Sequence, residues 1–531
     1  MGETMKKSNC IESMLGNIVY RHVYLLLLLV TSLTLGCSFF TNLLSGDITV
    51  AKLQKDSLVI ENVTIVDPRT GSKKVGQSIV ISDGRIESVG STLILKPNKS
   101  YKRINAQGLF AVPGFNNMHS HALQAKNSSA ELLLMLAEGV TGFRQMAGST
   151  ELLSQRSAGK LPLTELAPAL LAMPAEPIIP ISASTKDELS ELIQRQKKDG
   201  ADFIKVGWMS PSLFYEALRE SKKLGIPIVG HIPEGVDPTR AEFENFRTIE
   251  HLGPGDVIWI ACSSQKTILL SESIDKPTRT LPNFKLPNFA TPIIQSLIAG
   301  KMKRFLINPV LEDSPARVSR LQKALTSFDR NKCNALAEQF VQNDNWLVPT
   351  LVRLRTQYLQ DDPEYQKDKS IQFIPPHAYK EWLSVLNDFN QISTERKLIY
   401  KETYEAQKVL TKLFSDAKVP MMTGTDGSGQ TPGLSLQQEF KELAAAGISP
   451  LQILQMTTIQ PARFLKKTST MGLIAKGMNA DIVLLSADPT VKAENLGDIS
   501  GVIRDGNYHS KSDFDIYKKT IAESSDKNIR L

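Results

Sequence analysis

The sequence predicts an α/β protein, a (β/α)8 barrel of the TIM type with a small β-sandwich domain formed by both ends of the chain. Three observations support this fold class. The chain has 531 residues, of which 41% are hydrophobic, enough for one large and one smaller core. Strand-like and helix-like segments alternate through the middle, and short strand-like segments occupy both ends.

The two ends share a pattern of short strands. "SLVIENVTIVDPRTGSKKVGQSIVISDGRIESVG" alternates Val, Ile and Thr with polar residues, and turn sequences such as "DPRTG" and "SDGR" separate the runs. "GLIAKGMNADIVLLSADPT" and "ISGVIRDGNYH" have the same character near the C-terminus. We therefore expect residues 48–112 and 468–531 to form one composite β-sandwich.

Residues 113–467 alternate in the way a barrel requires. The strand-like runs are "LFAVPGFNNMH", "GVTGFRQM", "PALLAMPA", "DFIKVGW", "IPIVGHIP", "FRTIEHLG", "WLVPTLV" and "VPMMTGTDG". Between them lie amphipathic segments such as "KDELSELIQRQKKDG" and "SPSLFYEALRESKKLG", and both end in glycine, as helices commonly do. Strands that alternate with helices predict a parallel barrel. The stretch of about 263–345 is then an insertion between the sixth and seventh strands.

Residues 1–36 predict a signal peptide of the lipoprotein type. Basic residues precede an apolar run of 13 residues, Val23 to Leu35, which is short for a bilayer span of about 20. The Gly36-Cys37 pair is similar to a bacterial lipoprotein signal, although Thr34 stands where Leu is usual. We expect lipid on Cys37 to hold the protein in the cell envelope, facing the periplasm or at the outer membrane. Ordinary cleavage nearby and an uncleaved anchor are the alternatives.

Charge argues against one class of partner, and the cysteine content leaves the state of one cysteine pair open. The formal net charge of +7 is small for this length, and Lys and Arg alternate with Asp and Glu, so no nucleic-acid partner is expected. Of the four cysteines, Cys10 would leave with the signal and Cys37 would carry lipid. Cys262 and Cys333 remain, either as a disulfide or as two thiols. A homo-oligomer also stays open.

Rare polar residues stand where the predicted strands end. His119 and His121 end the first strand, Lys205 the fourth, His231 the fifth, His251 the sixth and Asp426 the eighth. Active sites of such barrels lie at the carboxyl ends of the strands. The chain has only seven histidines, so four of them at the strand ends of one barrel indicate a shared role. Imidazole and carboxylate are ligands that borderline divalent metals prefer, which predicts a metal site.

Lys205 is the exception among these residues, because an ammonium group repels a metal ion and is costly to bury. A structural lysine at this position would need a carboxylate partner. Alternatively, burial favours the neutral amine, which can add carbon dioxide. The resulting carbamate has two oxygens, one for each of two metal ions about 3.5–4 Å apart.

These motifs together resemble the amidohydrolase superfamily, most closely its imidazolonepropionase-like and prolidase-like branch. The resemblance rests on "PGFNNMHSH", "FIKVGW", "VGHIPE", "IEHLG", "VPTLV", "GTDGSG" and the C-terminal "GLIAKGMNADIVLLSADP". It implies that His119 and His121 bind the more buried metal and that His231 and His251 bind the second. A carboxylated Lys205 would bridge the two ions. Asp426 would touch the first metal and move protons.

Three positions depart from the family pattern. Asn117 and Gln145 stand where Asp is common, and Gln437 where many relatives have His. None is an expected metal ligand, so they bear on support of the site or on substrate fit. Arg353, just after "VPTLV", is a candidate for binding a substrate carboxylate by a bidentate pair, with a surface or barrel-rim arginine as the alternative.

The resemblance implies a hydrolase that cleaves an amide bond with a hydroxide held between two divalent ions. Dipeptides, N-acyl amino acids and cyclic amides are the expected substrates. Zinc is the default ion from the ligand type, while manganese, iron or cobalt would fit the same residues. Hydrolysis of a lactone, another ester or a phosphotriester remains an alternative on the same site. A non-catalytic metal-binding lipoprotein is the alternative of another class.

Overall fold

A computed structural model describes residues 57–92, 95–96, 100–180, 182–253, 255–275 and 300–527. The predicted signal peptide and Cys37 lie outside the described residues, as does part of the predicted insertion. All elements below belong to one compact unit, Lys55–Leu531. Within the described ranges, the structure contains no helix with the length and apolar character needed to cross a membrane.

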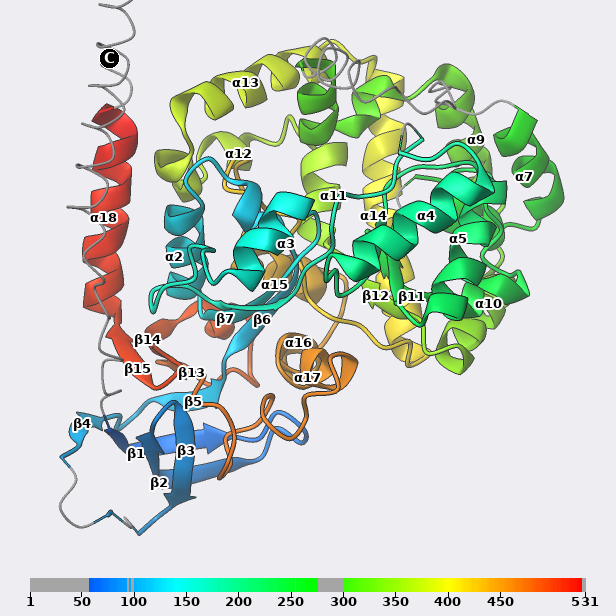
Figure 1. Ribbon diagram of the computed structural model, residues 1–531. Helices are drawn as coiled ribbons and strands as arrows, with labels where there is room; N and C mark the ends of the chain where they lie inside the picture. Colours follow the sequence, from blue (N-terminus) through cyan, green and yellow to red (C-terminus); the bar gives the residue numbers. More distant parts are fainter. Residues whose placement is uncertain are drawn as a thin grey trace, which may run out of the picture. The chain divides into compact units, whose positions relative to one another are not determined.

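Strands from both ends of the chain form one eight-stranded sheet, drawn in blue and in orange to red in Figure 1. Its strands are β1 (Leu58–Val66), β2 (Lys73–Ser82), β3 (Arg85–Gly90), β4 (Lys102–Asn105), β5 (Phe110–Pro113), β13 (Ile482–Leu485), β14 (Ile499–Arg504) and β15 (Asn507–Ser510). The order is β15-β14-β13-β5-β1-β2-β3, with β4 also on β1. The antiparallel pairing of β5 with β13 joins the two ends. A two-layer sandwich is therefore not confirmed, and the domain boundaries stay predictions.

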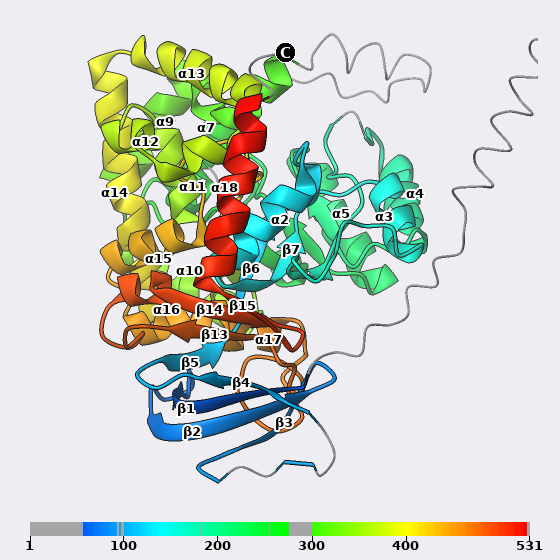
Figure 2. The same cartoon turned by 90° about the vertical axis from the view of Figure 1, so that its left-hand side faces the viewer.

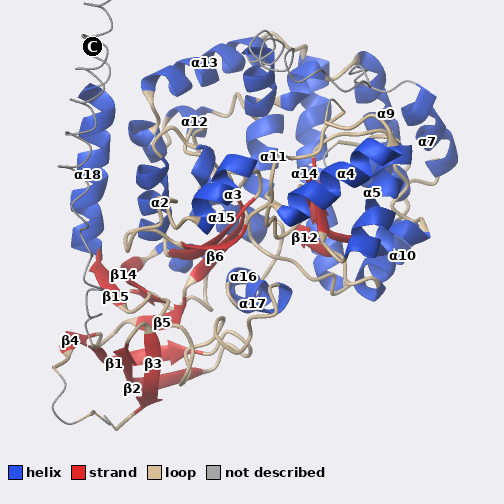
Figure 3. Ribbon diagram, in the orientation of Figure 1, coloured by secondary structure: helices blue, strands red, loops and turns tan. Residues whose placement is uncertain are grey.

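The middle of the chain builds two parallel sheets. One has the order β6-β7-β8, and the other β12-β11-β10-β9. The strands are β6 (Phe115–Ser120), β7 (Val140–Gln145), β8 (Ala169–Ala172), β9 (Ile204–Val206), β10 (Ile228–Gly230), β11 (Phe246–Glu250) and β12 (Trp346–Val348). Seven of the eight predicted barrel strands are thus present. Helices surround both sheets in Figure 3, as in a TIM-barrel-like α/β fold.

The eighth predicted strand, "VPMMTGTDG", is not a regular strand. Isolated parallel bridges connect it to its neighbours, Leu347 with Met421 and Ser120 with Gly427, and a further bridge joins Ile178 to Val206. No closed barrel of regular strands is therefore present in the described part of the chain. The segment passes very close to β6, because a Cβ on Gly424 would lie 2.7 Å from the Cβ of His119. This contact brings the residues after Gly424 next to the histidines.

The helices begin where local sequence favours them. The amide of Glu188 binds the side chain of Thr185 in a capping box at the start of α4, and α5 begins with Ser210 and a proline and ends at left-handed Gly225. The α-helices with described bounds are α2 (Ser128–Ala137), α3 (Thr150–Ser157), α4 (Lys186–Lys198), α5 (Pro211–Leu224), α6 (Val257–Ala261), α7 (Lys266–Asp275), α9 (Pro315–Thr326), α10 (Arg330–Gln342), α11 (Leu351–Tyr358), α12 (Pro363–Gln366), α13 (Pro376–Asn390), α14 (Thr394–Asp416), α15 (Leu436–Ala445), α16 (Pro450–Thr457), α17 (Ile459–Phe464) and α18 (Lys511–Lys527). The last of these, red in Figure 2, packs against α2.

The described part of the predicted insertion is helical and tied to the barrel. Cys262 and Cys333 form a disulfide that joins the end of α6 to α10. The buried Arg320 of α9 donates to Asp256 over 2.6 Å and also pairs with Glu234 in the loop after β10. A buried arginine with two carboxylate partners holds the insertion against loops at the carboxyl ends of the strands.

Candidate active site

All six predicted metal ligands line one cavity of about 1240 Å³, together with Arg353. The cavity lies where the parallel strands end. His119 lies in β6 with His121 just after it, Lys205 lies in β9, and His231 and His251 directly follow β10 and β11. Asp426 comes from the irregular eighth segment. The structure thus brings residues from five separate segments together, as the sequence predicts, while their roles as ligands stay predictions.

Asp426 is the centre of one half of the site. Its Oδ1 lies 2.9 Å from Nε2 of His119 and 2.9 Å from Nε2 of His121. Burial by itself raises the pKa of the Asp426 carboxyl, but the neighbouring imidazoles outweigh it and hold the pKa well below its usual range. The backbone of Asp426 is left-handed, with φ of 59°, a strained conformation that is typical of functional sites.

His251 and His231 form the other half. The ring centroid of His251 lies 4.6 Å from that of His119 and 5.1 Å from that of His231. Nδ1 of His251 is 2.6 Å from the hydroxyl of Thr350, which fixes the ring. Burial, with the Lys205 charge adding to it at His231, holds the pKa of both imidazoles well below the ordinary value. Both rings are therefore neutral near pH 7, the form that binds metal.

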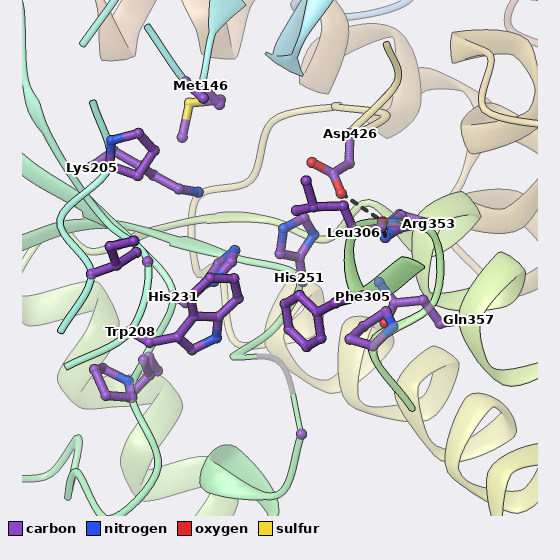
Figure 4. A pocket seen from close by; sticks show the side chains of 18 of the residues that line it. Met146, Lys205, Trp208, His231, His251, Phe305, Leu306, Arg353, Gln357 and Asp426 are labelled. Carbon is purple, nitrogen blue, oxygen red and sulfur yellow. Dashed lines mark hydrogen bonds and ion pairs between the residues drawn. The ribbon is translucent and has the colours of Figure 1, made fainter. Parts of the chain in front are cut away.

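Lys205 points into the same space in Figure 4. Its side chain is buried, and Nζ has no hydrogen-bond partner among the described residues. Burial lowers its pKa to about 8, although Glu250 and Asp426 act in the opposite direction. A Cβ on Gly230 would lie 2.3 Å from the carbonyl oxygen of Val206, so only glycine fits at this position next to β9, the strand that carries Lys205. A buried amine without a partner is costly unless another group joins it.

Glu250 and Arg144 complete the site, and the sequence analysis did not identify them. Oε2 of Glu250 lies 2.7 Å from Nδ1 of His119, while Oε1 accepts from Arg144 over 2.8 Å and from Thr248 over 2.6 Å. Burial raises the pKa of Glu250, but Arg144 and His119 outweigh it and lower the pKa strongly. An ionised carboxylate thus orients the first histidine. The signal available in the sequence was a glutamate at the end of the apolar run "FRTIEHLG".

Arg353 is neither a surface residue nor aimed at open solvent. It is 5% exposed, and its Nε lies 3.0 Å from Oδ2 of Asp426, an ion pair visible in Figure 4. Its other nitrogens donate to the carbonyl oxygens of Leu306, over 2.5 Å, and Ile307, over 3.0 Å. The side chain therefore connects the insertion to Asp426, and its predicted contact with a substrate carboxylate stays a prediction.

The three departures from the family pattern lie at different distances from the site. Asn117 accepts from the backbone of His119 over 3.2 Å and donates to Thr425 over 2.9 Å, so it supports the site. Gln145 accepts from the backbone of Leu123 over 3.2 Å. Gln437 lies on α15 beside Gly497 and does not line the cavity.

The residues present fit a divalent metal. His119, His251 and Asp426 offer one ligand atom each, all within 4.8 Å of one another. Nδ1 of His231 is buried, and it has no hydrogen-bond partner in the parts of the chain that the structure describes. Neutral imidazoles, a carboxylate and a partnerless amine gathered at one cavity are the donor set that a metal would satisfy.

Comparisons with known proteins give one family match and several similar folds. The model of the amidohydrolase family matches residues 401–509, which include Asp426. No curated protein matches in sequence. A bottromycin amidohydrolase has a similar fold, with a TM-score of 0.60 and 18% identity over 91% of this chain and 94% of its own.

Two further solved structures share the fold. A Xaa-Pro dipeptidase with bound methionine has a TM-score of 0.55 and 14% identity, covering 86% of this chain and 100% of its own. A prolidase in complex with N-methylphosphonate-L-proline has a TM-score of 0.52 and 15% identity, covering 86% and 99%. At such identities these likenesses show the fold alone, and the sequence match to the amidohydrolase family is confined to residues 401–509. The chain is therefore similar to the amidohydrolase family in sequence over residues 401–509, and to solved amidohydrolase and prolidase structures in fold over most of its length.

Proposed function

We propose that the protein is a binuclear metal-dependent hydrolase that cleaves an amide bond in a dipeptide, an N-acyl amino acid or a cyclic amide. The observation that carries the proposal is the convergence of six candidate ligands on one cavity. His119, His121 and Asp426 would hold one ion, and His231 and His251 the other. Lys205, as its carbamate, would bridge them. Zinc is the ion we expect from the donor set.

The chemistry follows from charge. When bound, divalent ions would lower the pKa of a water molecule and polarise a carbonyl oxygen. Asp426 is ionised and close to His119 of β6 and to His121 just after it, so it would be placed to accept a proton from that water and deliver it to the departing nitrogen. Arg353 holds the other oxygen of Asp426 and restricts its rotation. Glu250 keeps His119 in a single orientation.

The proposed location is the cell envelope, with the body attached through lipid on Cys37. A peptide-scavenging or amide-hydrolysing enzyme would meet small substrates there. Replacement of Cys37 by Ser should release the protein from the membrane fraction. If the variant fractionates like the wild type, the result would contradict lipidation of Cys37 and indicate an uncleaved anchor.

The test is hydrolysis of dipeptides, N-acyl amino acids and cyclic amides by the full-length chain loaded with zinc in the presence of bicarbonate. Asp426→Asn should lower kcat by at least about 100-fold, since general acid–base transfer contributes roughly that much. Lys205→Ala should lose at least one metal ion per chain. Glu244→Gln is the control, because Glu244 is an exposed carboxylate that pairs with Lys222 and does not line the cavity.

Each other outcome points elsewhere. Two bound metal ions without amide hydrolysis would direct the search to lactones, other esters and phosphotriesters. If the chain bound no metal and hydrolysed none of the substrates, the result would support a non-catalytic binding protein. Full metal content and activity in Lys205→Ala would contradict the bridging role.

A further inference from the structure

The metal-site histidines continue into an aromatic pair at one end of the cavity. The ring centroids follow one another from His119 to His251 at 4.6 Å and from His251 to His231 at 5.1 Å. Trp208 comes next, 5.9 Å from His231, and Phe305 lies 5.0 Å beyond Trp208, edge to face. Asp426 contacts His119, the first ring of this series, and Trp208 contacts His231, the last of its histidines. Both aromatic rings therefore adjoin the candidate ligands in the same cavity.

The aromatic pair comes from two distant parts of the chain. Trp208 follows β9, three residues after Lys205, and Phe305 belongs to the helical residues 300–307 of the predicted insertion. Both rings are half-buried and line the cavity. Leu306 lines it as well and is 59% exposed, a large apolar side chain that protein does not cover. Figure 4 labels Phe305 and Leu306 among the residues that line the same cavity as His251.

The backbone that carries Phe305 is fixed. Arg353 donates to the carbonyl oxygens of Leu306 and Ile307, and Asn308 donates to that of Gln357 over 3.0 Å. The same arginine pairs with Asp426. Arg353 thus fixes the backbone next to Phe305 relative to the Asp426 carboxylate. Such a fixed position is what a specificity pocket requires.

We propose that Trp208 and Phe305 form a subsite for the acyl part of the substrate and select amides whose acyl group carries a large apolar, preferably aromatic, side chain. This inference rests on the proposed function, in which Asp426 serves the departing nitrogen. The scissile carbonyl then lies along the histidine row, and the leaving group lies near Asp426. The acyl side chain then lies against the two rings, beside His231. Offset and edge-on contacts between aromatic groups would stabilise it there.

The experiment compares substrates that differ only in the acyl residue. Glycyl, alanyl, leucyl and phenylalanyl amides of one amino acid are hydrolysed by the metal-loaded full-length chain, and kcat/KM is measured. The wild type should prefer the phenylalanyl over the glycyl substrate by roughly 10- to 200-fold, the range that contacts in an apolar pocket supply. Equal kcat/KM for both substrates would overturn the proposal.

Substitutions of Trp208 and Phe305 test whether these two rings cause the preference. Trp208→Ala and Phe305→Ala should each reduce the ratio of phenylalanyl to glycyl kcat/KM by about 10-fold or more, and Trp208→Phe should retain most of it. Phe464→Ala is the matched control, because Phe464 also pairs edge to face with a tryptophan, Trp346, but lies outside the cavity lining. An equal loss with both substrates would show a structural role only.

A binding measurement separates this inference from the proposed function. Phenylacetate and acetate are titrated into the metal-loaded protein, and their affinities are compared by calorimetry. Tighter binding of phenylacetate that is lost in Trp208→Ala would support the subsite even if no amide were hydrolysed. Equal binding of the two acids would contradict the subsite even if amides were hydrolysed.

Discussion

Glu250 supports the candidate metal site through its direct contact with His119. It is fully buried, and it joins Nδ1 of His119 to the Arg144 guanidinium. Glu250→Ala should weaken metal binding by about 10- to 100-fold, because the orienting partner of a metal-binding histidine is lost. It should also destabilise the fold, since Arg144 would be left as an unpaired buried charge.

The measurement is a competition titration of zinc against a chelator, with thermal unfolding recorded on the same samples. Glu220→Gln serves as the control, because this mostly buried carboxylate on α5 accepts from Ser190 and has no place in the cavity lining. An unchanged zinc affinity in Glu250→Ala would show that His119 needs no carboxylate to hold its orientation.

Lys205 gives the site a pH dependence whose sign can be worked out. Only the neutral amine adds carbon dioxide, and burial lowers its pKa to about 8. The neutral fraction is then about a tenth at pH 7 and about half at pH 8. At a fixed pressure of carbon dioxide, reactivation of the decarboxylated apoprotein by bicarbonate and zinc should accelerate from pH 6 to pH 8.5 and then level off. A rate that falls across this range would contradict carbamate formation on Lys205.

At the residue scale, the sequence was informative about rare residues and silent about their partners. Histidines and a lysine at the ends of apolar runs are visible without a fold. Glu250 contacts His119 from 131 residues away, and Thr350 contacts His251 from 99 residues away. Glutamate and threonine are common residues, so only tertiary packing reveals these roles. The pairing of Arg353 with Asp426 was missed for the same reason.

At the element scale, α11 connects both halves of the site through its first turn. Thr350, just before it, is left-handed with φ of 47°, and its hydroxyl binds His251 instead of capping the helix. Glu439 of α15 supplies the missing cap by accepting from the amide of Val352 over 2.8 Å. Arg353, in the same turn, pairs with Asp426. The position of this helix end therefore affects His251 and Asp426 together.

Glu439 should tolerate one substitution and not another. Burial raises its pKa well above the ordinary value, although backbone amides of α11 act in the opposite direction, so burial favours the neutral acid. Glu439→Gln keeps the accepting oxygen and should retain activity within about 3-fold. Glu439→Ala leaves the helix uncapped, which costs roughly 0.5–2 kcal/mol of unfolding free energy. It should also lower kcat/KM through Thr350.

Thermal unfolding and steady-state kinetics on both variants check this expectation. Lys441→Ala, an exposed position on the same helix, is the control. If Glu439→Gln were as damaging as Glu439→Ala, the carboxylate charge would be required instead of the accepting oxygen.

Helices and strands were predictable where the spacing of apolar residues agreed with the residues that begin or end an element. The helices α4 and α5 follow from amphipathic segments closed by glycine, and seven of the predicted strands follow from short apolar runs. The eighth run has the same composition but bends away from regular pairing. It contains Gly424, which lets the backbone approach His119, and the left-handed Asp426. These constraints come from packing around the site, and the apolar pattern alone does not contain them.

At the scale of the whole molecule, segments distant in sequence fix one another. The pairing of β5 with β13 joins the two ends, which the composition of both ends predicted. The sequence did not predict how the insertion is held. Arg320 bridges Asp256 and Glu234, and Arg353 binds the backbone at residues 306 and 307. These contacts keep the apolar end of the cavity in place.

The disulfide between Cys262 and Cys333 should contribute to this fixation. It closes a segment of 71 residues that contains Phe305 and Leu306. Closing a loop of this length restricts the unfolded chain by an amount worth about 2–4 kcal/mol, so Cys262→Ala/Cys333→Ala should unfold at a lower temperature than the wild type. A reducing agent should lower the unfolding temperature of the wild type and leave that of the double variant unchanged. If the wild type unfolded at the same temperature with and without reductant, the buried arginine contacts alone would hold the insertion.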